Sequence, residues 1–264
     1  MKAKSTIVTL ATLLLTCLSS VQAKQNDGSA TKTAFETLQF PSSDGLEITA
    51  DYYQAASDPQ TPLILLCHQA RWSRGEYRQI APKLNAMGFN CLAIDQRSGD
   101  QVNGVPNETA KRAKSAKQKN SFVDAEPDIL AAIAYARENY AKGKLILWGS
   151  SYSSALSLRI AGENPKLVDG VMAFAPGEYF GRFGKPNDWI SQSARKIQAP
   201  AFITSAKNEG PLWKSIYSAI PGEEKSMFLP TTAGNHGSRA LWNEFTDSKN
   251  YWTAVSKFLQ QFQK

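Results

Sequence analysis

LILWGSSYS, residues 145–153, joins an apolar run to a cluster of small residues near the middle of the chain. The run LILW is typical of a parallel strand that is buried on both faces. The stretch SSALSL that follows, residues 153–158, is compatible with a helix. The sequence therefore predicts a strand, a sharp turn and a helix, with a serine at the tip of the turn.

Steric crowding indicates which serine stands at the tip. A residue on so tight a turn has strained backbone angles, so the residues two positions before and after it must be small. Gly149 stands two positions before Ser151, whereas the position that would serve Ser150 holds the large Trp148. We therefore predict that Ser151 is a nucleophile, although Ser153 stands where such turns usually have glycine.

The beginning of the chain has the features of a secretory signal. Lys2 and Lys4 precede an uncharged apolar run over residues 6–18, and VQA at 21–23 offers small residues to a signal peptidase. The run is too short to cross a bilayer of ~30 Å, which takes ~20 helical residues. We predict cleavage after Ala23 and an exported protein, periplasmic or secreted, with no stable membrane span. A lipid anchor at Cys17 is the alternative.

The mature chain is long enough for one sizeable α/β domain. Cleavage leaves 241 of the 264 residues and lowers the formal net charge from +7 to +5. We predict a flexible segment over residues 24–34 and a folded domain over 35–264. Cys67 and Cys91 lie in apolar runs, near opposite ends of neighbouring strands, so we expect buried thiols rather than a disulfide.

Strand and helix patterns alternate from residue 36 onward. The turn SSDG at 42–45 predicts a hairpin, because Asp-Gly is a strong turn signal. Further strands are predicted over residues 62–68, 90–95, 145–148, 168–175, 201–205 and 227–230, and helices over 77–87, 127–140, 153–161, 212–220 and 251–262. A hairpin followed by repeated strand–helix units predicts a mostly parallel, doubly wound sheet of about eight strands with helices on both faces.

The segment over residues 100–120 interrupts this alternation, because it is polar and basic. It follows a strand that ends near Asp95, at the sheet edge where ligands bind in such folds. We predict a solvated loop or an exposed helix. A positive flap that favours anionic substrates is the alternative. The basic run lacks interleaved aromatic residues, so no nucleic-acid partner is expected.

A serine hydroxyl needs a base within hydrogen-bond reach. The chain has two histidines, His68 at the end of an early strand and His236 in the loop TTAGNHG, residues 231–237. The common order of nucleophile, acid and histidine along the chain favours His236 as the base. The acid should follow the strand over 201–205. Glu209 is the first candidate there, and Asn208 and Glu178 are the alternatives.

Two further groups complete the predicted catalytic machinery. A developing oxyanion needs backbone donors, and the N–H of Tyr152 lies at the start of the predicted helix, whose dipole favours negative charge. The second donor is expected in the loop after residues 63–67, from Gln69 or Ala70. No metal-ligand cluster is visible in the sequence, and the chemistry requires no cofactor.

Aromatic residues near the same edge are candidates for binding substrate. Trp72 is predicted to form one apolar wall of the pocket, and Tyr179 and Phe180 the other. The alternative, that these rings only pack against the sheet, stays open.

Together these motifs resemble the α/β-hydrolase superfamily, in particular its dienelactone-hydrolase-like and esterase branches. The matching residues are, in the family's order along the chain, HQ at 68–69, DQRSG at 95–99, GSSYS at 149–153, NE at 208–209 and GNHG at 234–237. The resemblance implies an α/β-hydrolase fold with a structural His68, and with Asp95 and Arg97 as residues that brace the site.

The chain departs from the family at three positions. Gln69 and Ser153 stand where glycine is usual, and Asn208 stands near the usual aspartate. The last departure puts the acid in doubt. Only about 25 residues, 176–200, occupy the place where large lipases carry a helical cap, so no large cap is expected.

The sequence thus predicts an exported, carboxylesterase-like serine hydrolase that cleaves a small ester through an acyl-enzyme on Ser151. A peptidase of the prolyl or aminopeptidase kind on the same fold is one alternative. A non-catalytic binding protein of this fold is the other. The sequence makes no prediction of the oligomeric state.

Overall fold

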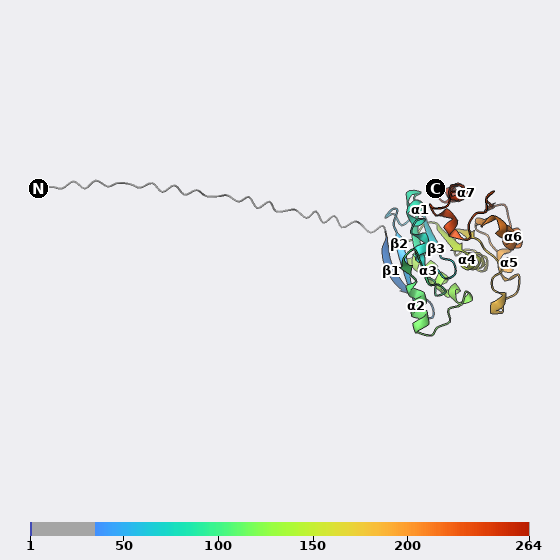
Figure 1. Cartoon of the computed structure of the whole chain (residues 1–264), viewed down its shortest axis with the longest axis horizontal. Coiled ribbons are helices and arrows are strands. Elements are labelled where there is room, and N and C mark those ends of the chain that lie inside the picture. Colours follow the sequence, from blue (N-terminus) through green and yellow to red (C-terminus); the bar gives the residue numbers. More distant parts are fainter. Residues whose placement is uncertain (2–34, 264) are drawn as a thin grey trace. The chain divides into compact units, whose positions relative to one another are not determined.

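An eight-stranded sheet forms the centre of this computed structural model, which describes Met1 and residues 35–263 (Figure 1). The predicted signal sequence and the segment over 24–34 lie outside the described residues. In chain order the strands are β1 Glu36–Pro41, β2 Glu47–Tyr53, β3 Leu63–Cys67, β4 Asn90–Ile94, β7 Leu145–Ser150, β8 Gly170–Phe174, β9 Ala201–Thr204 and β10 Lys225–Phe228.

The spatial order of the strands is β1-β2-β4-β3-β7-β8-β9-β10. The hairpin β1–β2 and the pair β2–β4 are antiparallel, and every other pair is parallel. The predicted α/β fold with a mostly parallel sheet of about eight strands is therefore confirmed.

Helices cover both faces of this sheet. They are α1 Ala81–Ala86, α2 Glu108–Ser115, α3 Glu126–Asn139, α4 Tyr152–Glu163, α5 Trp189–Ala194, α6 Gly210–Ala219 and α7 Ser248–Leu259. The helix predicted over residues 77–87 is wrong over its first four residues. The 3-10 turn η1, Arg74–Tyr77, comes first, and α1 begins only at Ala81. Pro82 is consistent with a helix that begins at Ala81, because proline lacks the N–H that an interior helical residue donates and is tolerated only in a first turn.

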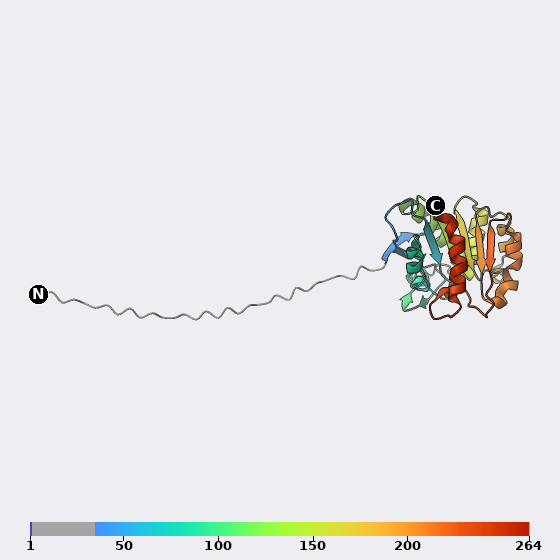
Figure 2. The same cartoon turned by 90° about the horizontal axis from the view of Figure 1, so that it is seen from above.

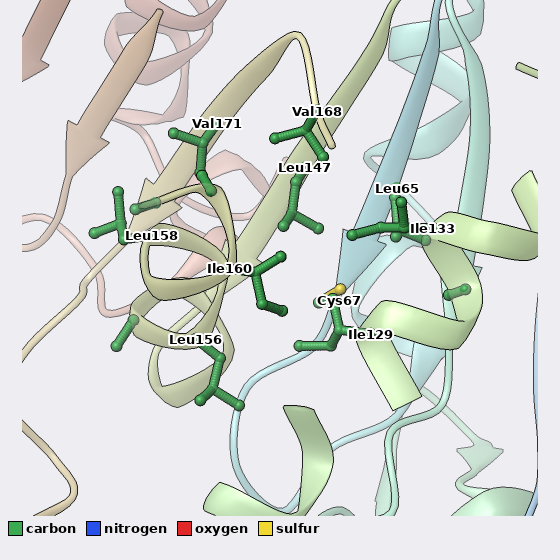
Figure 3. Close-up of a cluster of buried hydrophobic side chains, with 14 of the residues drawn as sticks. Leu65, Cys67, Ile129, Ile133, Leu147, Leu156, Leu158, Ile160, Val168 and Val171 are labelled. Atoms are coloured by element: carbon green, nitrogen blue, oxygen red, sulfur yellow. The ribbon is translucent and has the colours of Figure 1, made fainter. Parts of the chain in front are cut away.

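Alternate strand residues belong to two cores. Leu65 of β3 and Leu147 of β7 pack with Ile129 of α3 and Leu156 of α4 on one face (Figure 3). Neighbouring residues of the same strands, Trp148 among them, pack with α1 and α7 on the other face. Figure 2 shows α7, in red, in front of the strands on that face. Cys67 and Cys91 are buried free thiols, as predicted.

The parallel register brings the carboxyl ends of four strands to one edge of the sheet. Cys67 of β3 pairs with Gly149 of β7, which pairs with Ala173 of β8. Phe174 of β8 in turn pairs with Thr204 of β9. The loops that follow these strands carry the predicted site residues, so the topology gathers them at this edge.

The basic segment over 100–120 forms a small hairpin, β5 Gln101–Val102 and β6 Val105–Pro106, followed by α2. The N–H of Thr49 in β2 donates to the hydroxyl of Thr109 in α2 at 2.9 Å, which holds the helix against the sheet. The lysines of the segment are exposed. The segment therefore contains an exposed helix. Within residues 35–263, no helix has the length and apolarity needed to cross a membrane.

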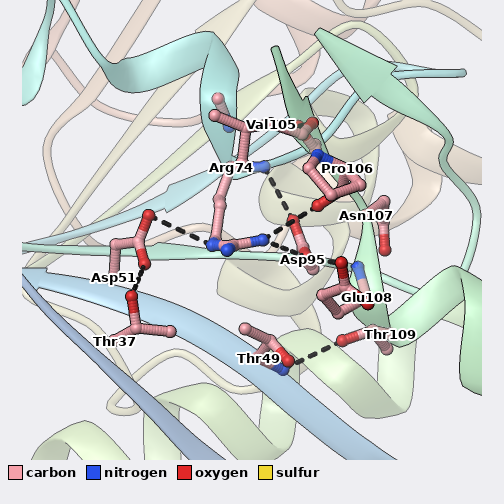
Figure 4. A network of polar contacts seen from close by, with 12 residues as sticks. Thr37, Thr49, Asp51, Arg74, Asp95, Val105, Pro106, Asn107, Glu108 and Thr109 are labelled. Carbon is pink, nitrogen blue, oxygen red and sulfur yellow. Dashed lines mark hydrogen bonds and ion pairs between the residues drawn. The ribbon is translucent and has the colours of Figure 1, made fainter. Parts of the chain in front are cut away.

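Two buried arginines brace this part of the sheet. Arg74 of η1 donates to Asp95 Oδ2 at 2.7 Å, and its Nε lies 3.1 Å from Asp51 Oδ2 without hydrogen-bond alignment (Figure 4). The guanidinium of Arg97 lies 2.6 Å from carboxylate oxygens of both Asp44 and Asp128. Asp95 and Arg97 thus make the buried ion pairs of a scaffold.

Candidate active site

Ser151 stands at the carboxyl end of β7, directly before α4. Its backbone angles, φ 57° and ψ −122°, are strained for a residue with a side chain. Its N–H donates to the carbonyl of Phe174 at 2.7 Å, and its carbonyl accepts the N–H of Ser154 at 3.0 Å. The surrounding backbone therefore holds the strained turn, and the half-buried side chain stands at its tip.

The residues around this turn explain how it tolerates Ser153. A Cβ at Gly149 would lie 2.4 Å from the Cα of Ser154, so glycine is needed there. Ser153 has room for its side chain. Its Oγ accepts the N–H of Ser150 at 2.9 Å and lies 2.8 Å from the carbonyl of Cys67, to which it donates. The serine that replaces glycine thus ties the turn to the end of β3.

His236 meets one of the three acid candidates. Its Nδ1 lies 2.5 Å from Oε1 of Glu209, in the 3-10 turn η4, Lys207–Glu209, after β9. The other carboxylate oxygen of Glu209 accepts the N–H of Ala206 at 3.0 Å. Because a carboxylate only accepts, Nδ1 carries the proton of a neutral imidazole, and Nε2 remains as the base.

The other two acid candidates lie elsewhere. Glu178 accepts the N–H groups of Ile190 and Ser191 at 2.9 and 2.8 Å, at the start of α5. Asn208 is exposed to solvent. Among the described residues, neither side chain makes a hydrogen bond to His236. The departure at Asn208 therefore leaves the histidine with a carboxylate partner, one residue further along the chain.

The two loop candidates for the oxyanion hole differ in availability. The N–H of Gln69 donates to Oε2 of Glu76 at 2.8 Å, so the prediction that Gln69 supplies an oxyanion donor is wrong. Ala70 is the next residue. Within residues 35–263, the N–H groups of Ala70 and of Tyr152 have no hydrogen-bond partner. Tyr152 opens the twelve-residue helix α4, whose N-terminus favours negative charge.

The predicted aromatic walls need one correction. Phe180 is completely buried and packs edge-on against Trp189 at 5.0 Å, so it cannot contact substrate. A ring near this edge looks the same in the sequence whether it faces the pocket or the core. Tyr179 is half-buried, and its hydroxyl donates to the carbonyl of Ala175 at 2.7 Å. Trp72 is half-buried and stacks on Trp242 at 5.2 Å.

Sequence reasoning missed one aromatic residue, Phe122, that lies beside the turn at Ser151. Phe122 stacks on the ring of Tyr152 at 4.6 Å and is partly exposed. The guanidinium of Arg182 lies 4.7 Å from the centre of the Phe122 ring. Phe122 comes from the segment before α3, and no signal in the sequence indicated its place.

His68 has a structural role, as the resemblance implied. Its Nδ1 donates to the carbonyl of Gln69 at 2.8 Å, and its Nε2 accepts from Gln96 N–H and from Asn107, each at 3.0 Å. Burial lowers the pKa of His68 to about 4, so the ring is neutral at neutral pH. Both ring nitrogens are occupied, which leaves His236 as the histidine that can move a proton.

Glu76 is a second residue that sequence reasoning missed. It is fully buried, and besides the N–H of Gln69 it accepts the hydroxyl of Ser150, the residue before Ser151, at 2.7 Å. An acidic residue in RGEY, residues 74–77, shortly after the end of a buried strand, was the available signal.

Fold and site together define an α/β-hydrolase. The sequence model of the family described as serine aminopeptidase, S33, matches residues 58–198, and the chain belongs to this family. It is accordingly a hydrolase.

Solved structures share this fold at low sequence identity. The esterase Pf2001 of Pyrococcus furiosus has a TM-score of 0.66 and 15% identity, over 87% of this chain and 93% of that one. A dienelactone hydrolase from Anabaena variabilis has a TM-score of 0.65 and 14% identity, over 88% and 100%. The acylaminoacyl peptidase of Pyrococcus horikoshii has a TM-score of 0.62 and 14% identity, over 89% of this chain but 43% of that one. No curated protein matches the chain.

Proposed function

We propose that this chain is an exported serine hydrolase that cleaves a small ester through an acyl-enzyme on Ser151. One observation carries the proposal. A serine on a strained turn after β7 shares an edge of the sheet with a histidine whose Nδ1 is bonded to Glu209. Serine, imidazole and carboxylate are the three parts of a nucleophilic triad.

The chemistry follows from the bonds of each group. His236 Nε2 takes the proton of Ser151 as the serine oxygen bonds to the ester carbonyl carbon. The resulting imidazolium is stabilised by Glu209, which stays ionised. His236 then returns the proton to the leaving alcohol as the ester bond breaks. A water molecule, deprotonated by the same imidazole, attacks the acyl-enzyme and releases the acid.

The tetrahedral intermediate carries its negative charge on the former carbonyl oxygen. Tyr152 N–H and Ala70 N–H are the donors that we assign to this oxygen, because both are backbone groups without another partner among the described residues. Removal of one such donor costs roughly 10²- to 10³-fold in rate in a comparable enzyme.

The surroundings favour a compact substrate. Between β8 and β9 the chain forms only the 3-10 turn η3, Gly181–Phe183, and the six-residue α5. Trp72 and Phe122 are partly exposed aromatic residues, and Phe122 stacks on Tyr152, one of the proposed oxyanion donors. A short acyl ester is therefore the substrate class that we propose.

A peptidase is the second candidate, favoured by the description of the family. An ester and an aminoacyl amide of the same acyl group discriminate between the two candidates. The proposed esterase should hydrolyse the ester far faster, and a preference for free α-amino groups with amide cleavage would support the peptidase.

The test of the nucleophile is the intact mass of the protein after reaction with a fluorophosphonate, with Ser151→Ala in parallel. One adduct that maps to Ser151 and is absent from the variant is expected, and the variant should lose about 10⁶-fold in turnover. A folded wild-type chain that forms no adduct would favour the non-catalytic binding protein. Expression of the full chain in an exporting host should also yield a mass that lacks residues 1–23, and an uncleaved product would contradict export.

A further inference from the structure

Glu76 is a fully buried carboxylate that connects three loops at the carboxyl edge of the sheet. Its Oε2 accepts the N–H of Gln69 at 2.8 Å, and its Oε1 accepts the hydroxyl of Ser150 at 2.7 Å. The oxygen of that hydroxyl accepts the N–H of Ser238 at 2.9 Å. One side chain thus joins the oxyanion loop, the turn before the nucleophile and the loop after the histidine.

Close packing leaves these loops little freedom. Gly237, next to the histidine, has φ +72°, and a Cβ there would lie 2.5 Å from Ser150 Oγ. The same Cβ would lie 2.8 Å from Oε1 of Gln69. The histidine loop is therefore in contact with both residues that Glu76 binds, so a shift of either one would move it.

The position of Glu76 is itself held by the scaffold. Glu76 belongs to η1, whose first residue, Arg74, is bonded to Asp95 through both its backbone N–H and its guanidinium (Figure 4). The carbonyl of Glu76 accepts the indole N–H of Trp242 at 2.9 Å. The turn that presents the carboxylate is thus held by the ion pair with Asp95 and by Trp242, four residues after Ser238.

We propose that Glu76 is a positioning residue, which as a carboxylate keeps the oxyanion loop, the nucleophile turn and the histidine loop in one arrangement. This inference rests on the ester hydrolysis proposed above. By occupying the N–H of Gln69, Glu76 leaves that of Ala70 as the loop donor. By binding Ser150 it fixes the residue before Ser151. Glu76 itself touches no substrate.

The charge of Glu76 is coupled to that of the histidine. Burial raises the pKa of Glu76 to about 7, and a positive charge on His236 acts in the opposite direction. The other titratable groups that face it are Cys67, Tyr77 and Tyr152, and burial raises the pKa of each, so they are neutral near pH 7. An ionised Glu76 therefore stabilises the imidazolium that forms during attack. Activity should require that ionised form.

Glu76→Gln tests the proposal, because it removes the charge and keeps the shape. The carboxamide oxygen still accepts the N–H of Gln69, but its NH₂ group cannot accept the hydroxyl of Ser150. We expect kcat to fall roughly 10- to 100-fold with KM unchanged, less than the loss of an oxyanion donor. The acid limb of the kcat/KM profile should change from two ionisations to one, which a merely structural role would not produce. Glu178→Gln is the matched control.

Ser150→Ala is the second variant, and it carries the test alone if Glu76→Gln fails to fold. It removes one hydrogen bond and leaves the carboxylate, so kcat should fall while the acid limb keeps two ionisations. Unchanged kcat in Ser150→Ala, or a Glu76→Gln profile that matches the wild type, overturns the proposal. A wild-type chain whose Ser151 is labelled by the fluorophosphonate keeps the proposed function even then. A wild type whose Ser151 is not labelled would contradict both the proposed function and the role proposed for Glu76.

Discussion

Two clusters of buried carboxylates involve the short turn η1, and their partners differ. Arg74 places a cation between Asp51 and Asp95. Glu76, two residues later, accepts only from neutral groups, and within residues 35–263 it forms no ion pair with lysine or arginine. The first cluster has the partners that make buried charge tolerable. The second keeps a carboxylate in a costly place next to the proposed nucleophile.

This difference distinguishes carboxylates that stabilise the fold from a carboxylate that acts in the proposed reaction. A buried charge with a bonded counter-charge holds elements together, and the guanidinium of Arg74 opposes the effect of burial, which raises the pKa of Asp95 to about 6. A buried carboxylate with neutral donors changes its charge near neutral pH, and such groups cluster at functional sites. Both carboxylates are hydrogen-bonded, so the number of bonds does not distinguish them. The presence of the guanidinium does.

Among the carboxylates, the largest expected effect concerns Glu209, which is partly exposed and bonded to the imidazole of His236. Glu209→Gln should lower kcat by roughly 10³- to 10⁴-fold, because a carboxamide favours the wrong tautomer of His236. Ester hydrolysis by the purified variant measures this loss. Glu178→Gln should change kcat little and cost about 1 kcal/mol of stability, since Glu178 caps α5. Equal and small effects in the two variants would refute the choice of acid.

The next prediction concerns the cluster in which Arg74 pairs with Asp51 and Asp95. Arg74→Met should reduce the free energy of unfolding by about 3–5 kcal/mol, because it leaves Asp51 and Asp95 buried without their cation. Urea unfolding followed by circular dichroism measures the loss. Arg112→Met is the control, since its ion pair with Glu47 is partly exposed and worth about 0–1 kcal/mol. Similar losses in both variants would mean that the buried cluster does not brace the sheet.

The same contrast explains which parts of the molecule the sequence could predict. The strands and the turn at Ser151 depend on local patterns, namely apolar runs and the need for Gly149. The proximity of Glu209 to His236 follows from the order of strands, because both residues come after parallel strands that end at one edge. Such features can be predicted without knowledge of individual contacts.

Apart from the start of α1, the errors and omissions concern tertiary contacts. Glu76 and Ser150 are 74 residues apart in the chain, and no periodic pattern relates them. The sequence predicts a free N–H at Gln69, because its acceptor, the side chain of Glu76 seven residues later, reaches it only when η1 folds back. Phe180 faces the core rather than the pocket for the same reason. Tertiary packing determines which of the alternatives that the sequence left open is realised.

The smallest expected effect is on the pH dependence of the free energy of unfolding, and it tests the contrast between the two carboxylate clusters. Folding raises the pKa of Glu76 from 4.5 to about 7, so between these values the folded chain binds more protons than the unfolded one. The wild type therefore loses stability as the pH rises through this window, and the penalty is fully present above about pH 7. Glu76→Gln lacks that titration. Its free energy of unfolding, relative to the wild type, should improve by roughly 3 kcal/mol between pH 4.5 and 8.5. Glu163→Gln is the control of opposite sign, because its hydrogen bond to Lys196 lowers the pKa of Glu163. Parallel curves for wild type and Glu76→Gln in urea unfolding would mean that Glu76 is already ionised throughout, and the cost that distinguishes the two clusters would then be absent.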